Sequence, residues 1–275
     1  MIIGAQKAGT SWLKEQLRSH PEIFMPRDEL HFFDRAQSPS RDIAWYRRQF
    51  VDARDDQLVG EKTPNYLFLP DNPDIVDGHL RIVDVLPDVL LIAILREPVA
   101  RAVSAVNHMI REGLVSPLHS IDELLGRRRG DLSWNVIEVG RYVGQVAAFL
   151  RLVGPDRLLL FFYRDDIVER PAATVETACR FLGVSPRWDA DRLATRVNSG
   201  RPSRLRLLVE YYLSLPSRWT RRLDRLSRPY YALPTEATLR RLHECYEPYN
   251  ERLFELIGRR PASGWRYAPE AVRSR

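Results

Sequence analysis

The chain has 275 residues, of which 44% are hydrophobic and 28% are charged, and its net charge is +6. This composition predicts one sizeable globular domain and excludes a disordered or fibrous chain. No apolar run approaches the roughly 20 residues of a membrane-spanning helix, and the first residues enter a strand pattern rather than a signal peptide. A cytoplasmic location is therefore expected, with a missing upstream segment as the alternative.

The first motif is a glycine loop that follows an apolar strand pattern at residues 1–3. Gly4 and Gly9 have the spacing of a phosphate-binding loop, and a helical pattern follows whose N-terminal amides would bind an anion. The lysine, however, is Lys7, inside the loop, and Thr10 stands where ATP-hydrolysing loops place it. Lys7 is therefore expected beside the first phosphate of an anionic nucleotide. The alternative is a chance glycine spacing, which the preceding strand disfavours.

Short apolar runs alternate along the chain with stretches of helical spacing, which is typical of parallel strands joined by helices. The expected strands are residues 1–4, 90–95 and 158–163. The expected helices are residues 10–19, 42–50, 99–111, 138–153 and 172–182. The sequence predicts a single α/β domain over residues 1–275, with a P-loop-like central parallel sheet flanked by helices on both faces.

A cluster of acids, imidazole and aromatic rings occupies residues 28–34. A strand-like alternation would place Glu29 and His31 on one face and the intervening apolar side chains on the other. Glu29 is then a candidate general base, with His31 or Asp34 tuning its orientation and charge. On this pattern alone, a structural role is about as well supported as a catalytic one.

Two further cations and a hydroxyl extend the candidate site. Lys62 lies in a loop-like segment and would serve either transition-state charge or a surface ion pair. Arg96 follows the central strand, where phosphate-loop triphosphatases usually carry a magnesium-binding aspartate, and its forked guanidinium suits a phosphate. Ser104, two turns into the next helix, would add a hydroxyl to that phosphate. A surface salt bridge is the alternative for Arg96.

Four ordered motifs together resemble the sulfotransferases that use 3′-phosphoadenosine 5′-phosphosulfate (PAPS), and within them the heparan sulfate glucosaminyl (N- and 3-O-) branch. The motifs are Gln6-Lys7-Ala8-Gly9-Thr10-Ser11, Glu29-Leu30-His31-Phe32-Phe33-Asp34, Glu61-Lys62-Thr63-Pro64 and Leu95-Arg96-Glu97-Pro98 with Ser104. The similarity runs from Met1 to about Val184 and resumes from Leu242 through Gly258.

The resemblance implies a role for each of these positions. The 5′-phosphosulfate would be bound by Lys7, Ala8, Gly9, Thr10, Ser11 and Trp12, and the 3′-phosphate by Arg96 and Ser104. Glu29 would deprotonate the acceptor, supported by His31, Asp34 and Lys62, while Lys7 would neutralise the departing phosphate oxygen. No metal is implied, and no Cys/His cluster suggests one.

Other nucleotide contacts are less well defined by the resemblance. Tyr163 and Arg164, at the end of a strand, are candidates for contacting the adenine. The chain lacks the lysine-glycine-arginine loop and paired cysteines that the heparan sulfate enzymes carry near the nucleotide, and Arg201 or Arg204 is a candidate replacement for that loop's cation.

This departure falls in a variable basic segment at residues 196–234. From Arg196 to Arg228, nine arginines stand against two acids, so this stretch carries +7 while the whole chain carries +6. Leucines, tyrosines and Trp219 interleave with the arginines. Three interpretations of the segment remain open. It could form a lid over an anionic or amphipathic acceptor, a patch that rests on a membrane surface, or a solvated helix with an apolar side toward the core. No recognition motif indicates nucleic-acid binding.

The resemblance thus implies a metal-independent transferase that moves the sulfuryl group of PAPS to an acceptor hydroxyl and releases adenosine 3′,5′-bisphosphate. The expected acceptor is a sugar, a glycosylated small molecule or natural product, or a lipid, with an amine acceptor left open. The competing hypotheses are a P-loop nucleotide kinase, disfavoured by Thr10 and Arg96, and a non-catalytic nucleotide-binding protein, disfavoured by Glu29, His31 and Lys62 occurring together. If the basic segment at residues 196–228 binds lipid, the protein would associate peripherally with a membrane.

Overall fold

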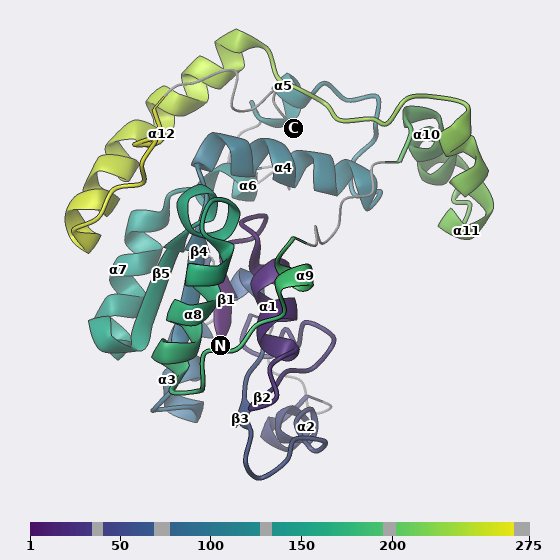
Figure 1. The fold of residues 1–275 in the computed structure, drawn as a ribbon. Coiled ribbons are helices and arrows are strands. Elements are labelled where there is room, and N and C mark those ends of the chain that lie inside the picture. The colour runs from purple at the N-terminus through teal and green to yellow at the C-terminus, as the bar shows by residue number, and fades with distance from the viewer. Residues whose placement is uncertain (35–40, 69–77, 127–133, 195–201, 267–275) are drawn as a thin grey trace. The chain divides into compact units, whose positions relative to one another are not determined.

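The computed structural model describes residues 1–34, 41–68, 78–126, 134–194 and 202–266 (Figure 1). They form two compact units, each assembled from separate stretches of the chain. Unit 1 takes its described residues from Met1–Arg96, Tyr142–Val197 and Arg252–Ala262. Unit 2 takes them from Glu97–Arg141, Asn198–Glu251 and Ser263–Arg275. The expectation of one sulfotransferase domain over the whole chain stays a prediction.

The central sheet of unit 1 has three parallel strands in the order β1 (Ile2–Gly4), β4 (Leu91–Leu95) and β5 (Leu158–Phe162). These are the strands that the apolar runs predict. Ile2 pairs with Ile92, and β4 pairs with β5 residue by residue from Leu91–Leu158 onward. All five residues of β4 are buried, as expected for a central strand covered on both faces.

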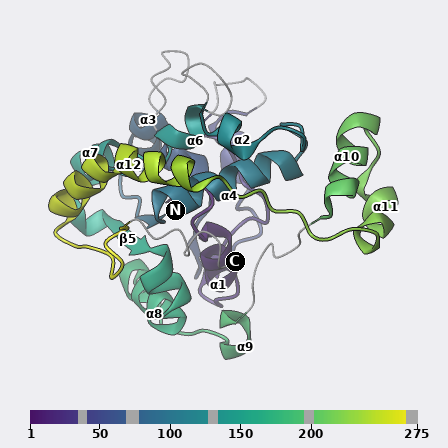
Figure 2. The same ribbon diagram turned by 90° about the horizontal axis from the view of Figure 1, so that it is seen from above.

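Helices cover this sheet. The helices of unit 1 as a whole are α1 (Thr10–Arg18), α2 (Ile43–Arg48), α3 (Gly78–Val85), α7 (Tyr142–Val153), α8 (Pro171–Leu182) and α9 (Ala190–Leu193). Both views show α7 and α8 on either side of β5, while α1 packs against β1 and α8 (Figures 1 and 2). The fold is therefore the predicted α/β arrangement, a P-loop-like parallel sheet flanked by helices.

Smaller elements complete unit 1. A second parallel pair joins β2 (Ile23–Phe24) to β3 (Leu58–Val59). Single helical turns are η1 (Pro64–Leu67), η2 (Pro155–Arg157) and η3 (Tyr163–Val168). α8 shows how local sequence sets boundaries, because Pro171 begins it and Gly183, with φ of 73°, ends it.

Unit 2 is helical in the residues that the structure describes. Its elements are α4 (Pro98–Arg111), α5 (Ile121–Leu124), α6 (Trp134–Glu138), α10 (Arg204–Leu213), α11 (Ser217–Thr220), η4 (Arg221–Arg225) and the first part of α12 (Glu236–Ile257). A shared apolar core joins α4, α5, α6, α10 and α12, and includes Val103, Leu124, Leu207 and Leu242. Within the described ranges, none of the helices combines the length and hydropathy needed to cross a bilayer.

One predicted helix is wrong in its start. The spacing predicts a helix over residues 138–153, but α6 ends at Glu138 and α7 begins at Tyr142. The break contains Gly140, where a Cβ atom would lie 2.9 Å from Cε1 of Tyr246. Tyr246 also donates a hydrogen bond from its hydroxyl to the Ile137 carbonyl at 3.0 Å. The ring of Tyr246, distant in the sequence, therefore packs directly against the backbone of this break.

Candidate functional site

The glycine loop leads from β1 into α1, and its two glycines permit close approach of other segments. A Cβ on Gly4 would lie 2.5 Å from the Cβ of Leu67, and a Cβ on Gly9 would lie 2.9 Å from Cδ2 of Tyr163. Gly9 also has φ of 92°, a conformation that L-residues with side chains rarely adopt. Because α1 begins directly after Gly9, its first amides point into the loop, the arrangement that binds anions in proteins.

A guanidinium, an aromatic ring and the backbone of Lys7 lie together at the carboxyl edge of the central sheet. Arg96 follows β4, and Nη1 of Arg96 donates to the backbone oxygen of Lys7 at 2.5 Å. Tyr163 follows the neighbouring strand β5, and its ring centroid lies 5.2 Å from Cζ of Arg96. Tyr142 donates from its hydroxyl to the Arg96 carbonyl at 2.9 Å. Ligands of open α/β sheets bind at this edge, so Lys7, Arg96 and Tyr163 are placed to meet one.

The acid and imidazole residues form a second group beside the same loop. The Lys62 ammonium donates to Glu29 and, at 3.2 Å, to the hydroxyl of Ser11. His31 lies between two carboxylates, with Nε2 3.4 Å from Glu29 Oε2 and Nδ1 2.7 Å from Asp34 Oδ2. The Lys62 side chain is 5% exposed and that of Glu29 is 36% exposed. The structure therefore brings the candidate base and its three predicted supporting residues together beside the phosphate loop and leaves Glu29 accessible.

The surroundings of Glu29 shift its pKa downward. Burial by itself would raise the pKa, but hydrogen bonds from His31 and Lys62, together with their charges, outweigh it and lower the pKa from 4.5 to about 2. The carboxylate is therefore ionised at neutral pH and able to accept a proton.

The backbone that carries this group differs from the sequence expectation. Residues 28–34 form no strand, and His31 has φ of 49°. Glu29 and His31 still face each other, because the irregular backbone turns them to the same side. Lys62 is also not in an isolated loop, because it forms a parallel β-bridge with Ile2 of β1. That bridge places Lys62 next to the phosphate loop.

Sequence reasoning assigned no role to Lys14, and it included Glu61 in a motif without giving it one. Lys14 of α1 is 4% exposed, and its ammonium donates to the backbone oxygen of Arg27, two residues before Glu29. Burial, followed by the nearby Lys62 charge, lowers the pKa of Lys14. Burial raises the pKa of Glu61, while hydrogen bonds from Tyr46, Thr63 and Tyr66 oppose the rise. The sequence does contain a signal for Lys14, because this lysine lies next to the apolar residues of the helix that follows the glycine loop.

Three further predicted nucleotide contacts are Trp12, Ser104 and Arg201. Trp12 is buried, and its indole Nε1 donates to the Leu193 carbonyl at 3.3 Å. Ser104 is half-buried on α4 in unit 2, and Arg201 lies outside the described residues. In the part of the chain that the structure describes, no set of three or more His, Cys, Asp or Glu side chains is placed to hold a metal ion.

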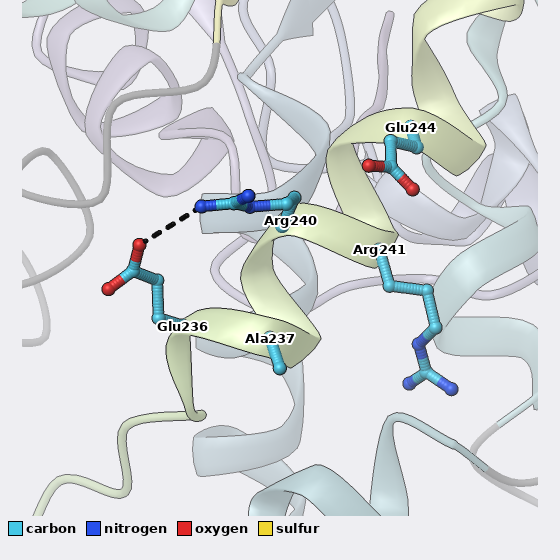
Figure 3. A pocket seen from close by; sticks show the side chains of 5 residues that line it. All are labelled: Glu236, Ala237, Arg240, Arg241 and Glu244. Carbon is cyan, nitrogen blue, oxygen red and sulfur yellow. Dashed lines mark hydrogen bonds and ion pairs between the residues drawn. The ribbon is translucent and has the colours of Figure 1, made fainter.

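A separate pocket of about 370 Å³ lies along the first turns of α12 in unit 2 (Figure 3). It is lined by Glu236, Ala237, Arg240, Arg241 and Glu244. Glu236 and Arg240 form an ion pair with a 3.4 Å separation, and Arg241 donates to the Leu125 carbonyl at 3.4 Å. The pocket contains none of the predicted site residues.

Comparisons with known proteins identify relatives of this chain. A family model described as "Sulfotransferase domain" matches residues 1–199. Human heparan sulfate glucosamine 3-O-sulfotransferase 6 is 30% identical over 270 residues, which cover 94% of this chain and 71% of the relative. Human heparan sulfate glucosamine 3-O-sulfotransferase 3B1 is 28% identical over 269 residues, covering 94% of this chain and 63% of the relative.

A solved structure of similar fold is also that of a sulfotransferase. The crystal structure of a sulfotransferase from Alicyclobacillus acidocaldarius superposes with a TM-score of 0.71 at 26% sequence identity, covering 96% of this chain and 97% of that chain. The family model spans the glycine loop, the acid and imidazole segment, Lys62 and Arg96. The chain therefore belongs to the sulfotransferase family.

Proposed function

We propose that this protein transfers the sulfuryl group of PAPS to a hydroxyl group of a glycan acceptor. The observation that carries the proposal is the Lys62 ammonium, which binds both the candidate base Glu29 and the phosphate-loop hydroxyl of Ser11. A residue that joins these two groups links the acceptor side of a transfer reaction to the donor side. The glycan acceptor is inferred from the relatives that are heparan sulfate glucosamine 3-O-sulfotransferases.

The chemistry of the glycine loop supports binding of the anionic end of PAPS. Gly9 allows Tyr163 to approach the start of α1, and the first α1 amides supply hydrogen-bond donors. Lys7 is assigned to the phosphate oxygen that leaves, and Arg96 with Ser104 to the 3′-phosphate. Tyr163, beside Gly9 and Arg96, is assigned to the adenosine.

The reaction then needs one proton acceptor and several cations. The acceptor oxygen bonds to sulfur as the bond between sulfur and the bridging phosphate oxygen breaks. The hydroxyl proton passes to Glu29, and the displaced electron pair stays on the phosphate of adenosine 3′,5′-bisphosphate. Fixed cations at the developing negative charge are the main way to lower such a barrier, and we assign this role to Lys7 and Lys62.

Lys62 also explains how a carboxylate with a low pKa serves as a base. The Lys62 ammonium donates to both Glu29 and Ser11. Oxygens of a bound sulfuryl group at the loop compete for the same ammonium. Weakening the Lys62 bond raises the pKa of Glu29 toward the value that proton abstraction requires. His31, held by Asp34, keeps the carboxylate oriented meanwhile.

A transfer assay tests this proposal. The protein is incubated with ³⁵S-labelled PAPS and heparan sulfate, with glycosylated small molecules, glycolipids and an amine-bearing glycan as further acceptors. We expect label in a glycan hydroxyl and an equal amount of adenosine 3′,5′-bisphosphate. Label on nitrogen would show that the acceptor group is an amine and not a hydroxyl. Intact PAPS with every acceptor, together with phosphate transfer from ATP, would overturn the proposal in favour of a nucleotide kinase.

We also propose that residues 202–228 bind an anionic membrane surface. Seven large hydrophobic side chains here are exposed, among them two tyrosines and Leu213, Trp219 and Leu226 at 64%, 70% and 72%. Seven arginines accompany Glu210 and Asp224, and both acids are paired with Arg206 at 2.8 Å. Exposed aromatic and aliphatic groups among arginines are typical of helices that lie in a lipid interface. Apolar side chains turned to solvent argue against a purely solvated helical face.

A further inference from the structure

Glu61 is a buried carboxylate, 1% exposed, in the segment that carries Lys62. Three hydroxyl groups donate to it. Tyr46 donates to Oε1 at 2.9 Å, Thr63 donates to Oε2 at 3.0 Å, and Tyr66 donates to Oε1 at 3.2 Å. The proposed transfer reaction assigns this carboxylate no chemical step.

The direction of these bonds has a consequence for the neighbouring segment. A hydroxyl has one proton, so Thr63 and Tyr66, which give theirs to Glu61, offer only lone pairs to other groups. The Tyr66 oxygen accepts from the backbone amides of Phe32 at 3.0 Å and Phe33 at 3.5 Å. The Thr63 oxygen accepts from the backbone amide of His31 at 3.4 Å. Glu61 thus orients both hydroxyls as acceptors for three successive amides.

Those amides belong to the irregular stretch that contains Glu29 and His31. This stretch lies outside the described helices and strands, and His31 has φ of 49°, so local backbone preference does not hold it. Glu61 is itself anchored to β1, because its carbonyl accepts from the Ile2 amide at 2.9 Å and the Thr63 amide donates to the Ile2 carbonyl at 3.1 Å. The network therefore connects the base to the strand that leads into the phosphate loop.

We infer that Glu61 is a positioning residue, which fixes the Thr63 and Tyr66 hydroxyls so that they hold Glu29 and His31 in register with Lys62 and the phosphate loop. This inference rests on the proposed transfer function. Misplacement of a catalytic group by about 1 Å can cost on the order of 100-fold in rate, so the register matters for turnover.

The chain offers a matched pair of tyrosines for the test. Tyr66→Phe removes one bond to Glu61 and the acceptor for two amides, whereas Tyr46→Phe removes one bond to Glu61 and touches none of those amides through its hydroxyl. Thr63→Val removes the acceptor for the His31 amide, and Thr63→Ser restores it. Glu61→Gln keeps the size of the side chain but introduces an amide donor that reverses one hydroxyl.

Two readouts on the full chain separate positioning from folding. Hydrogen exchange without any ligand reports the amides of His31, Phe32 and Phe33. Kinetics with ³⁵S-labelled PAPS and the acceptor found for the wild type give kcat, and titration with adenosine 3′,5′-bisphosphate gives the donor-site Kd. We expect Glu61→Gln, Thr63→Val and Tyr66→Phe to speed exchange by about fivefold or more and to lower kcat by about 10- to 100-fold with an unchanged Kd. Tyr46→Phe and Thr63→Ser should resemble the wild type.

Unchanged exchange and kcat in Glu61→Gln and Tyr66→Phe would overturn the inference. So would equal losses of kcat and of nucleotide binding in Tyr66→Phe and Tyr46→Phe, because that result indicates general destabilisation. A wild-type protein that binds no adenosine 3′,5′-bisphosphate and transfers no sulfuryl group would instead overturn the proposed function, and with it the catalytic purpose of the network, whatever the exchange data show.

Discussion

Arg96 donates a hydrogen bond from Nη1 to the backbone oxygen of Lys7 across 2.5 Å. The side chain that follows β4 thereby fixes the backbone of the loop that follows β1. Lys7 itself has φ of 67°, a conformation that needs support from its surroundings. The two cations assigned to the donor's phosphates are therefore coupled structurally, and Arg96 has a role in loop geometry in addition to the proposed phosphate contact.

Replacing this arginine should affect both roles. We expect Arg96→Ala to weaken binding of adenosine 3′,5′-bisphosphate by about 10- to 100-fold, since hydrogen bonds to charged groups contribute about 1.5–3 kcal/mol. Isothermal titration calorimetry measures the change. Arg180→Ala, an exposed arginine on α8, is the control and should bind normally. Wild-type affinity in Arg96→Ala would remove Arg96 from the donor site.

Glu29 carries the proposed proton transfer. Glu29→Gln should lower turnover by about 10²- to 10⁴-fold, the usual contribution of a general base, while nucleotide affinity stays near the wild-type value. The neighbouring exposed Asp28, changed to Asn, is the matched control and should leave turnover nearly unchanged. Steady-state rates with labelled PAPS and separate nucleotide titrations measure both quantities. Turnover near that of the wild type in Glu29→Gln would contradict the assignment.

The low pKa of Glu29 predicts a pH dependence of stability. The pKa is about 2 in the folded protein and 4.5 ordinarily, so the ionised carboxylate stabilises the fold fully above about pH 4.5. This contribution is lost progressively as the pH falls from 4.5 toward 2. Urea unfolding should therefore show an advantage of the wild type over Glu29→Gln at pH 6 that shrinks by pH 3.5.

Removing the cation provides the control for that measurement. Lys62→Met takes away one of the two groups that lower the pKa of Glu29, so the same comparison made in a Lys62→Met background should depend less on pH. A pH dependence equal to that of the wild-type background would show that Lys62 does not set the pKa of Glu29.

Gly9 combines left-handed backbone with crowding by Tyr163. Gly9→Ala should lower the Tm and weaken nucleotide binding, because the added Cβ meets the tyrosine ring at 2.9 Å and the αL conformation costs on the order of 1 kcal/mol for alanine. Gly183→Ala shares the positive φ but has no atom within 4 Å, so it isolates the backbone cost. We expect Gly183→Ala to lower the Tm less and to bind nucleotide normally. Equal effects of the two substitutions would contradict the close approach of Tyr163.

The surface at residues 202–228 predicts binding to vesicles that contain phosphatidylserine. Sedimentation of the full chain with such vesicles should decrease steeply as salt is raised. Replacing Arg218, Arg221 and Arg222 by alanine should weaken association by about 100-fold, at about 1 kcal/mol for each arginine near the lipid. The same replacement of exposed Arg18, Arg54 and Arg180 is the control. Absence of association with anionic vesicles would refute the membrane contact.

Local sequence patterns were sufficient for the sheet and for the phosphate loop. The apolar runs that become β1, β4 and β5 and the glycine spacing before α1 depend on residues close together in the chain. Because parallel strands end at one edge of the sheet, the positions of Lys7 and Arg96 could also be expected to converge there.

The rest of the site depends on contacts between distant segments. The conformation of residues 28–34 is set by hydroxyls of Thr63 and Tyr66, more than 30 positions further along the chain. Lys62 reaches Ser11 because it bridges to Ile2, and the interruption before α7 accommodates the ring of Tyr246. Periodicity and motif spacing contain no information about such contacts, so they did not predict the irregular backbone of residues 28–34, and the helix start predicted at residue 138 was wrong.

The measurement that tests the donor site most directly is the thermal stability of the purified chain with adenosine 3′,5′-bisphosphate and, separately, with ATP and magnesium. A ligand that binds the folded state at 100 times its Kd adds about 2.7 kcal/mol to the free energy of unfolding. We predict a clear rise in Tm with the bisphosphate, lost in Lys7→Ala, and little change with ATP and magnesium. Stabilisation by ATP and magnesium alone would contradict the account and indicate a nucleotide kinase.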